Sequence, residues 1–267
     1  MSVRNRIFWM MLLFFLLTPT VNGHIPFGSD GENNSLEDSV DFSEPTKSWT
    51  LYRELHEVKE ADYYKLHLKP GEKFHFSIST PRSEDPGFVP NAVVIWPREV
   101  KSGDVPDFVK VPLGYGAHLI EGVRPPQPIY EAFTPTSYYF VVEYSREVSA
   151  EGDYFFAVYD LDSGGRYNLA VGYVEEFTAL EWLKIPFDVI SIRIWEGQSL
   201  FLILTPLILT LLAGFSLLQT RYKIRNKPSI YVGLMAGLFY VGTGLMTTFQ
   251  MFIAAIGAAG THACMHV

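Results

Sequence analysis

Two short runs decide the fold of this chain: Asp62-Tyr-Tyr-Lys-Leu-His-Leu-Lys69 and Lys73-Phe-His-Phe-Ser-Ile-Ser79. In each run apolar and polar side chains alternate, which is the pattern of a strand with one buried face. Lys69-Pro-Gly-Glu72 between them has the composition of a turn. Further strands are expected at Ala92–Trp96, Tyr138–Glu143, Gly152–Tyr159 and Arg166–Tyr173. Short strands separated by Pro and Gly predict a mainly β domain, an antiparallel β-sandwich or jelly roll over residues 48–176.

Three motifs in this region resemble a known family. They are Asp62-Tyr63-Tyr64-x-Leu66-x-Leu68-x-Pro70-Gly71-Glu72, Glu151-Gly152-Asp153-Tyr154-x-Phe156-x-Val158 and Gly165-Arg166-Tyr167-x-Leu169-x-Val171. Together they resemble the bacterial and archaeal pre-peptidase C-terminal domain, over residues 55–174 with an insertion in the middle. The resemblance implies a small jelly roll that serves as an accessory or adhesive module. No catalytic residue is carried over, because the motifs belong to the scaffold.

Charge is segregated along the chain. All 29 acidic residues lie between Asp30 and Glu196, whereas the segment after Glu196 carries only four bases, between Arg221 and Lys227. The acidic part would repel phosphates, so nucleic acid is excluded as a partner.

The single cysteine, Cys264, rules out a framework of disulfides within the chain.

The N-terminus has the order of a secretory signal peptide over residues 1–23. Arg4 and Arg6 precede an apolar run at Ile7–Leu17, and the small-residue pattern Val21–Gly23 follows. An uncleaved anchor is the alternative interpretation.

Residues 24–47 are expected to form an acidic disordered tail. Gly28–Glu44 is rich in Gly, Ser, Asn, Asp and Glu and has no Lys or Arg, so it offers little to bury. Asn33-Asn34-Ser35 is an N-glycosylation sequon, which makes Asn33 a candidate glycosylation site in a secreted chain.

The C-terminal part predicts a two-helix transmembrane hairpin. The expected segments are a juxtamembrane amphipathic segment (177–197), a first transmembrane helix (198–219), a basic cytosolic loop (220–229), a second transmembrane helix (230–256) and a non-cytosolic C-terminus (257–267). Gly233, Gly237 and Gly244 form a small-residue face suited to helix packing, within the chain or with another membrane protein. The resulting expectation is an integral, multi-pass protein of the endoplasmic reticulum, the secretory pathway or the cell surface. The lipid bilayer is then a partner, and the sandwich is lumenal or extracellular.

The candidate binding residues lie in an expected long, stiff loop at Gly114–Ser137. Tyr115, His118, Tyr130 and Phe133 could bind a glycan, a peptide or a membrane-protein partner, because loops on a rigid sandwich often carry binding residues. The alternative is a segment that closes the sandwich and buries its aromatic side chains. The sequence has no nucleophile elbow, zincin motif or Walker loop, so a non-enzymatic function is predicted.

A second hypothesis is the handling of copper or zinc in the secretory pathway. His67 and His75 are expected to face each other across a hairpin, which would supply half of a metal site. The terminal His262, Cys264, Met265 and His266 combine ligands that suit Cu(I), with an ordinary helix end as the alternative. No other cofactor is predicted.

Overall fold

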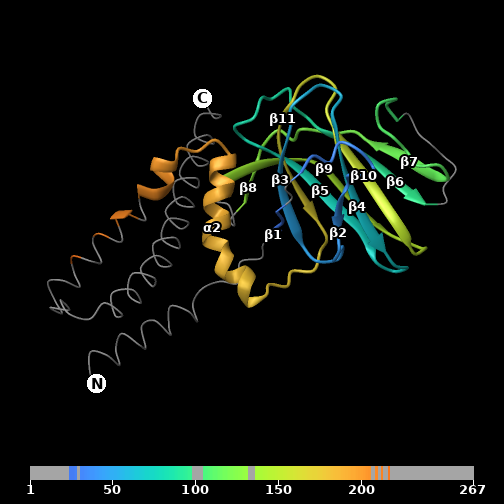
Figure 1. Cartoon of the computed structure of the whole chain (residues 1–267). Coiled ribbons are helices and arrows are strands. Elements are labelled where there is room, and N and C mark those ends of the chain that lie inside the picture. The colour runs from blue at the N-terminus through green and yellow to red at the C-terminus, as the bar shows by residue number, and fades with distance from the viewer. Residues whose placement is uncertain are drawn as a thin grey trace.

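The computed structural model describes residues 24–28, 31–97, 105–131 and 136–205, together with residues 208, 209, 212 and 216. These residues form two β-sheets packed face to face, with one helix alongside (Figure 1). The strand order is β1-β3-β11-β5-β9-β8 in the six-stranded sheet and β2-β4-β10-β6-β7 in the five-stranded sheet. The predicted β-sandwich is therefore confirmed.

The six-stranded sheet contains β1 (Ile25–Pro26), β3 (Trp49–Leu55), β5 (Lys73–Pro81), β8 (Ile129–Glu131), β9 (Thr136–Glu147) and β11 (Gly165–Val171). The five-stranded sheet contains β2 (Val40–Phe42), β4 (Ala61–Leu68), β6 (Asn91–Pro97), β7 (Tyr115–Ile120) and β10 (Gly152–Tyr159). All neighbouring strands are antiparallel except the pairs β1 with β3 and β2 with β4, which are parallel.

The core lies between the sheets and follows the alternation in the sequence. Leu66 of β4, Phe76 of β5 and Phe156 of β10 are each fully buried. The rings of Phe76 and Phe156 stack across the two sheets with centroids 4.2 Å apart. Burial of such aromatic side chains is the main stabilising contribution in a chain without intramolecular disulfides.

The turn at Lys69–Glu72 differs from the expected hairpin. β4 and β5 belong to different sheets, so this turn carries the chain from one sheet to the other. Gly71 makes the change of direction possible with a φ of 89°. The alternating pattern is the same in both arrangements, because each strand presents one face to the core in a hairpin and in a crossover between sheets.

The segment 24–47, expected to be a disordered tail, contributes two edge strands. β1 pairs with β3, and β2 pairs with β4. Ile25 and Phe42 are buried at 4% and 0% exposure, and the Phe42 ring lies against Tyr64 at 6.3 Å. A few apolar side chains in an acidic segment are therefore enough to order it, because the edges of preformed sheets supply backbone partners.

Helix α2 (Ala179–Trp195) lies against the outer face of the six-stranded sheet, where a juxtamembrane segment was expected (Figure 1). A capping box between Thr178 and Glu181 starts the helix. Lys47 Nζ contacts Glu181 Oε1 at 2.8 Å, which ties this end of α2 to the residues just before β3.

The transmembrane part of the predicted fold class is contradicted. In the portion of the chain that the structure describes, none of the helices combines the length and apolar character needed to cross a membrane. Of the first expected span, residues 200–205, 208, 209, 212 and 216 are helical. α2 precedes that span, and its side chains Val189 and Ile192 are buried. The prediction of an integral, multi-pass protein is corrected on the same finding. Residues 220–267, which include the loop, the second expected span and the C-terminus, lie outside the described residues.

Candidate functional site

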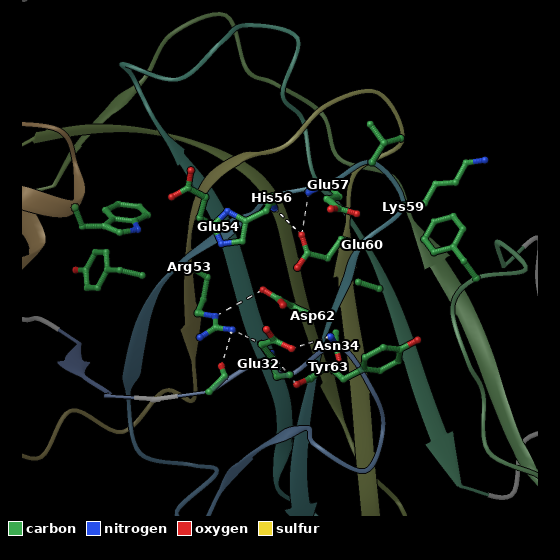
Figure 2. A pocket seen from close by; sticks show the side chains of 17 residues that line it. Glu32, Asn34, Arg53, Glu54, His56, Glu57, Lys59, Glu60, Asp62 and Tyr63 are labelled. Carbon is green, nitrogen blue, oxygen red and sulfur yellow. Dashed lines mark hydrogen bonds and ion pairs between the residues drawn. The ribbon is translucent and has the colours of Figure 1, made fainter.

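A cavity of about 810 Å³ opens at the end of the sandwich where β3 ends and β4 begins (Figure 2). Its volume falls within the range of small-ligand sites. Four parts of the chain that are distant in sequence form its walls: the segment Gly31–Asn34, the residues from Tyr52 to Tyr63, the side chain of Phe108, and Trp195 at the end of α2.

A buried polar cluster forms the floor of the cavity. Arg53 of β3 and Asp62 of β4 both point between the sheets, and Arg53 Nε lies 3.6 Å from Asp62 Oδ2. Arg53 Nη2 donates to the carbonyl of Gly31 at 3.2 Å and to Asn33 Oδ1. Asp62 accepts a hydrogen bond from the Tyr167 hydroxyl. Figure 2 shows Arg53 and Asp62 pointing toward each other at the centre of the site.

The cluster consists of groups that hold one another in place. Burial raises the pKa of Asp62, although the Tyr167 hydroxyl and the Arg53 guanidinium act in the opposite direction. Tyr64 and Tyr167 share a hydrogen bond of 2.6 Å between their hydroxyls, and burial raises the pKa of each far above the ordinary tyrosine value. Both hydroxyls therefore stay protonated and act as fixed dipoles below Asp62.

The rim of the cavity is acidic. Its carboxylates, apart from Asp62, are those of Glu32, Glu54, Glu57 and Glu60. The one ammonium among the lining residues, that of Lys59, extends away from the centre in Figure 2. Since Arg53 and Asp62 neutralise each other, the open part of the site has a negative potential.

The turn between β3 and β4 is held in a fixed conformation. The Glu60 carboxylate accepts hydrogen bonds from the backbone N–H groups of His56 at 2.5 Å and Glu57 at 3.0 Å. Lys59 has a φ of 66°, and its N–H donates to the carbonyl of Asp160 at 3.2 Å. A non-glycine residue in this conformation is held by its surroundings, so the rim is organised before any ligand arrives.

The predicted binding residues do not form one site. Tyr115 and His118 lie on β7 of the five-stranded sheet, and Tyr115 packs edge-on against Phe155 at 5.9 Å. Tyr130 lies on β8 of the six-stranded sheet. The expected loop therefore contains strands of both sheets, which keeps these side chains apart. Phe133 lies outside the described residues.

The predicted metal ligands are also separated. His67 Nδ1 contacts Asp153 Oδ1 at 2.8 Å, and this hydrogen bond raises the pKa of the imidazole. His75 lies on the other sheet, where burial lowers its pKa. No cluster of three or more metal-ligating His, Cys, Asp or Glu side chains occurs within the described ranges. The remaining predicted residues, namely His262, Cys264, Met265 and His266 with the helix-packing Gly233, Gly237 and Gly244, lie outside them.

Asn33, the predicted glycosylation site, is a wall residue of the cavity. It is 1% exposed, and its Nδ2 donates to the carbonyl of Tyr63 at 3.1 Å. A glycan on this nitrogen would have to displace that contact in the folded chain.

The cavity lined by Arg53, which we name the Arg53 cavity, was not predicted from the sequence. The one local signal was the dense run of charge at Arg53-Glu-Leu-His-Glu-Val-Lys-Glu60 between two strands. Nothing in that run shows that residues 31–34 and Trp195 complete the walls, because those contacts join segments far apart in the chain.

Comparison with known proteins gives a fold-level likeness. No family model and no curated protein matches this chain. Among solved structures it is similar to the pre-peptidase C-terminal domain of a collagenase from Bacillus anthracis, the family that its strand motifs resemble. The identity is 12%, the match covers 53% of this chain and 97% of that domain, and the TM-score is 0.27. At that score the likeness carries no argument about the site.

Proposed function

We propose that the β-sandwich is a non-catalytic binding module that takes a Lys- or Arg-containing peptide segment of a partner protein into the Arg53 cavity. The observation that carries this proposal is the excess of negative charge on the rim, where four carboxylates face one ammonium. The floor adds no net charge, because Arg53 and Asp62 form an ion pair there. An acidic cleft concentrates cationic ligands and raises their association rate.

The rim has groups available for such a ligand. Glu54 and Glu57 are exposed and have no ion-pair partner among the described residues. Tyr52 and Trp195, which are partly exposed, add aromatic surface on which the alkyl part of a Lys or Arg side chain can pack.

A binding function fits the lining better than catalysis does. The described lining side chains include no serine, threonine or cysteine that could act as a nucleophile. Asp62 is held by Tyr167 and Arg53, and the Glu60 carboxylate is occupied by the backbone of the turn. These acids have structural partners, so neither is positioned as a free general base.

The test is binding of a fluorescently labelled peptide of alternating Lys and Tyr to the purified full chain, followed by anisotropy. Removing two rim charges with Glu54→Gln/Glu57→Gln should weaken binding about fivefold, because two partly exposed ion pairs contribute about 0.5 kcal/mol each. Raising the ionic strength should weaken binding to the native chain further.

Two controls separate site binding from general attraction. Glu143→Gln/Glu147→Gln removes the same charge from exposed positions on β9, outside the cavity lining, and should leave affinity within twofold of the native chain, because salt screens exposed charges that do not contact the ligand. A peptide with Gln in place of Lys should bind weakly. The proposal is wrong if both double variants weaken binding equally, or if the Gln peptide or a neutral oligosaccharide binds more tightly than the Lys peptide.

A further inference from the structure

A second pocket lies between the two sheets, at the end of the sandwich opposite the Arg53 cavity. Its volume is about 170 Å³, comparable to that of an engineered cavity of about 150 Å³ that holds one benzene molecule. β4 begins in the lining of the Arg53 cavity and ends before the turn Lys69–Glu72. In that turn, the Gly71 N–H donates to the carbonyl of Val148, a residue of the pocket wall, at 2.9 Å. The length of β4 therefore separates the two sites.

Aromatic rings form the inner part of this pocket. Phe74 of β5 is 1% exposed and meets Tyr144 and Tyr154 edge-on, with ring centroids 5.4 and 5.7 Å apart. Trp96, near the end of β6, lies beside Tyr144 with centroids 6.3 Å apart. Trp96 and Tyr144 are only partly buried, so a ligand in the pocket can contact their rings.

Three exposed side chains, those of Arg146, Glu147 and Ser149, form the mouth of the pocket. The Arg146 guanidinium lies over the Trp96 ring, with Cζ 4.5 Å from the ring centroid. A stacked guanidinium directs its N–H donors along its own plane, a carboxylate supplies acceptors, and a hydroxyl supplies both. The lining carries one positive and one negative charge, so its net charge is zero and an ionic ligand gains little there.

The turn between β9 and β10, which carries part of the mouth, is held from two sides. The Val148 N–H donates to the carbonyl of Glu72 at 2.9 Å, and the Tyr154 hydroxyl donates to the carbonyl of Ala150 at 2.8 Å. Val148 is itself 6% exposed. A ligand therefore meets a wall that is already ordered, which lowers the entropic cost of binding.

We propose that this pocket, which we name the Trp96 pocket, binds one uncharged pyranose ring of a glycan. A pyranose is a single six-membered ring, so it matches the volume, and its C–H groups pack on aromatic side chains. Its hydroxyl groups both donate and accept hydrogen bonds, which suits a mouth formed by Arg146, Glu147 and Ser149. A plain aromatic ring would fill the same volume, but it would cover these groups without replacing the water bound to them. The proposal does not rest on peptide binding in the Arg53 cavity.

Saturation-transfer difference NMR on the purified full chain tests the site with the methyl glycosides of glucose, galactose, mannose and N-acetylglucosamine. At least one of them should bind with a Kd of about 1 mM, as expected for a ligand of this size. The flat ring of p-cresol should bind at least about fivefold more weakly than the best glycoside, because its one hydroxyl replaces fewer hydrogen bonds at the mouth. The proposal is wrong if no glycoside saturates the chain below about 20 mM, or if p-cresol binds as tightly as the best glycoside.

Variants of two lining residues locate the binding. Trp96→Ala and Arg146→Ala should each weaken binding of the best glycoside at least about tenfold, because each removes a wall of a small pocket. Trp96→Phe keeps a ring in place and should weaken binding only about threefold, so the site can be tested even if Trp96→Ala fails to fold.

Arg124→Ala is the matched control. The Arg124 guanidinium also lies over an aromatic ring, that of Tyr139, with Cζ 3.9 Å from the centroid, but neither residue lines the Trp96 pocket. This variant should leave glycoside affinity within about twofold of the native chain. Equal losses in Arg146→Ala and Arg124→Ala would refute the assignment of the site.

The labelled Lys peptide keeps this proposal separate from the proposed function. If the peptide binds through Glu54 and Glu57 and no glycoside binds, the proposed function stands and the glycan site fails. If a glycoside binds through Trp96 and Arg146 and the peptide does not bind, the glycan site stands and the proposed function fails. A glycoside that displaces the peptide in competition would place the sugar in the Arg53 cavity and contradict the assignment to the Trp96 pocket.

Discussion

The ion pair on the cavity floor gives the sharpest prediction about stability. Asp62→Ala leaves Arg53 without its carboxylate and Tyr167 without one of its two partners, while both remain largely inside the sandwich. Breaking a buried pair from one side costs about 3–5 kcal/mol. The Arg53 side chain is 18% exposed, so water can compensate it in part, and we expect about 3 kcal/mol.

Replacing both members should cost less than removing one. Arg53→Met/Asp62→Leu fills the same space with apolar groups and leaves no buried charge, so its free energy of unfolding should lie within about 1 kcal/mol of the native value. The partly exposed Asp153, whose carboxylate lies 3.1 Å from Lys65 Nζ and 2.8 Å from His67 Nδ1, is the matched control. Asp153→Ala should cost less than about 1 kcal/mol.

Equilibrium urea unfolding of the full chain and the three variants measures these differences at constant pH and salt. The native chain should have the highest free energy of unfolding. The control and the double variant should lie slightly below it, and Asp62→Ala should lie well below both. The reasoning is refuted if the double variant is at least as unstable as Asp62→Ala, because the cost would then come from lost packing or hydrogen bonds and not from an uncompensated charge.

Three further predictions concern titration, packing and backbone geometry. Burial raises the folded-state pKa of Glu196 from 4.5 to about 7, so between these pH values the folded chain retains a proton that the unfolded chain loses. The free energy of unfolding should therefore fall as the pH rises through this range, by up to about 3 kcal/mol. Urea midpoints at pH 5 and 8 measure the fall, which Glu196→Gln should abolish. Phe156→Ala, in the stacked core, should cost about 3–5 kcal/mol, against less than about 0.5 kcal/mol for Leu113→Ala, whose side chain is fully exposed; comparable losses in the two variants would contradict the packing argument. Gly172→Ala would place its Cβ 2.0 Å from the Lys47 carbonyl at a φ of 80°, whereas Gly71→Ala at a φ of 89° meets no atom within 4 Å. Thermal unfolding should show that Gly71→Ala lowers the free energy of unfolding by only about 1–2 kcal/mol and that Gly172→Ala lowers it by clearly more. A larger decrease for Gly71→Ala would show that the clash with the Lys47 carbonyl does not determine the cost.

Local patterns predicted the strands with long alternating runs. The expected strands at 152–159 and 92–96 correspond to β10 and β6 within one residue at each end. Strands with little alternation of their own, such as β1, β2 and β8, were not predicted, because they pair with edges that exist only after the sheets have formed. The helix at 179–195 was recognised as an amphipathic segment, but the surface it covers is the sheet.

The candidate site was hidden for the same reason. Glu54, Glu57 and Glu60 were visible as a charged turn, and such turns are common between strands. Their importance depends on Arg53 and Asp62 meeting from opposite sheets, because the turn at residues 56–60 connects β3 of one sheet to β4 of the other. The local pattern of the sequence does not assign these two strands to different sheets.

By itself, the sequence determined that this chain contains a β-sandwich, that its strands bury aromatic and aliphatic faces, and that its acidic charge lies between Asp30 and Glu196. These properties follow from the period of side chains along a strand and from composition, both of which are local. Only the tertiary structure decided which strands share a sheet, that residues 24–47 join the edges, and that Trp195 completes a cavity around Arg53. The physical reason is that burial and electrostatic pairing depend on which distant segments meet, and a local pattern is compatible with several such arrangements.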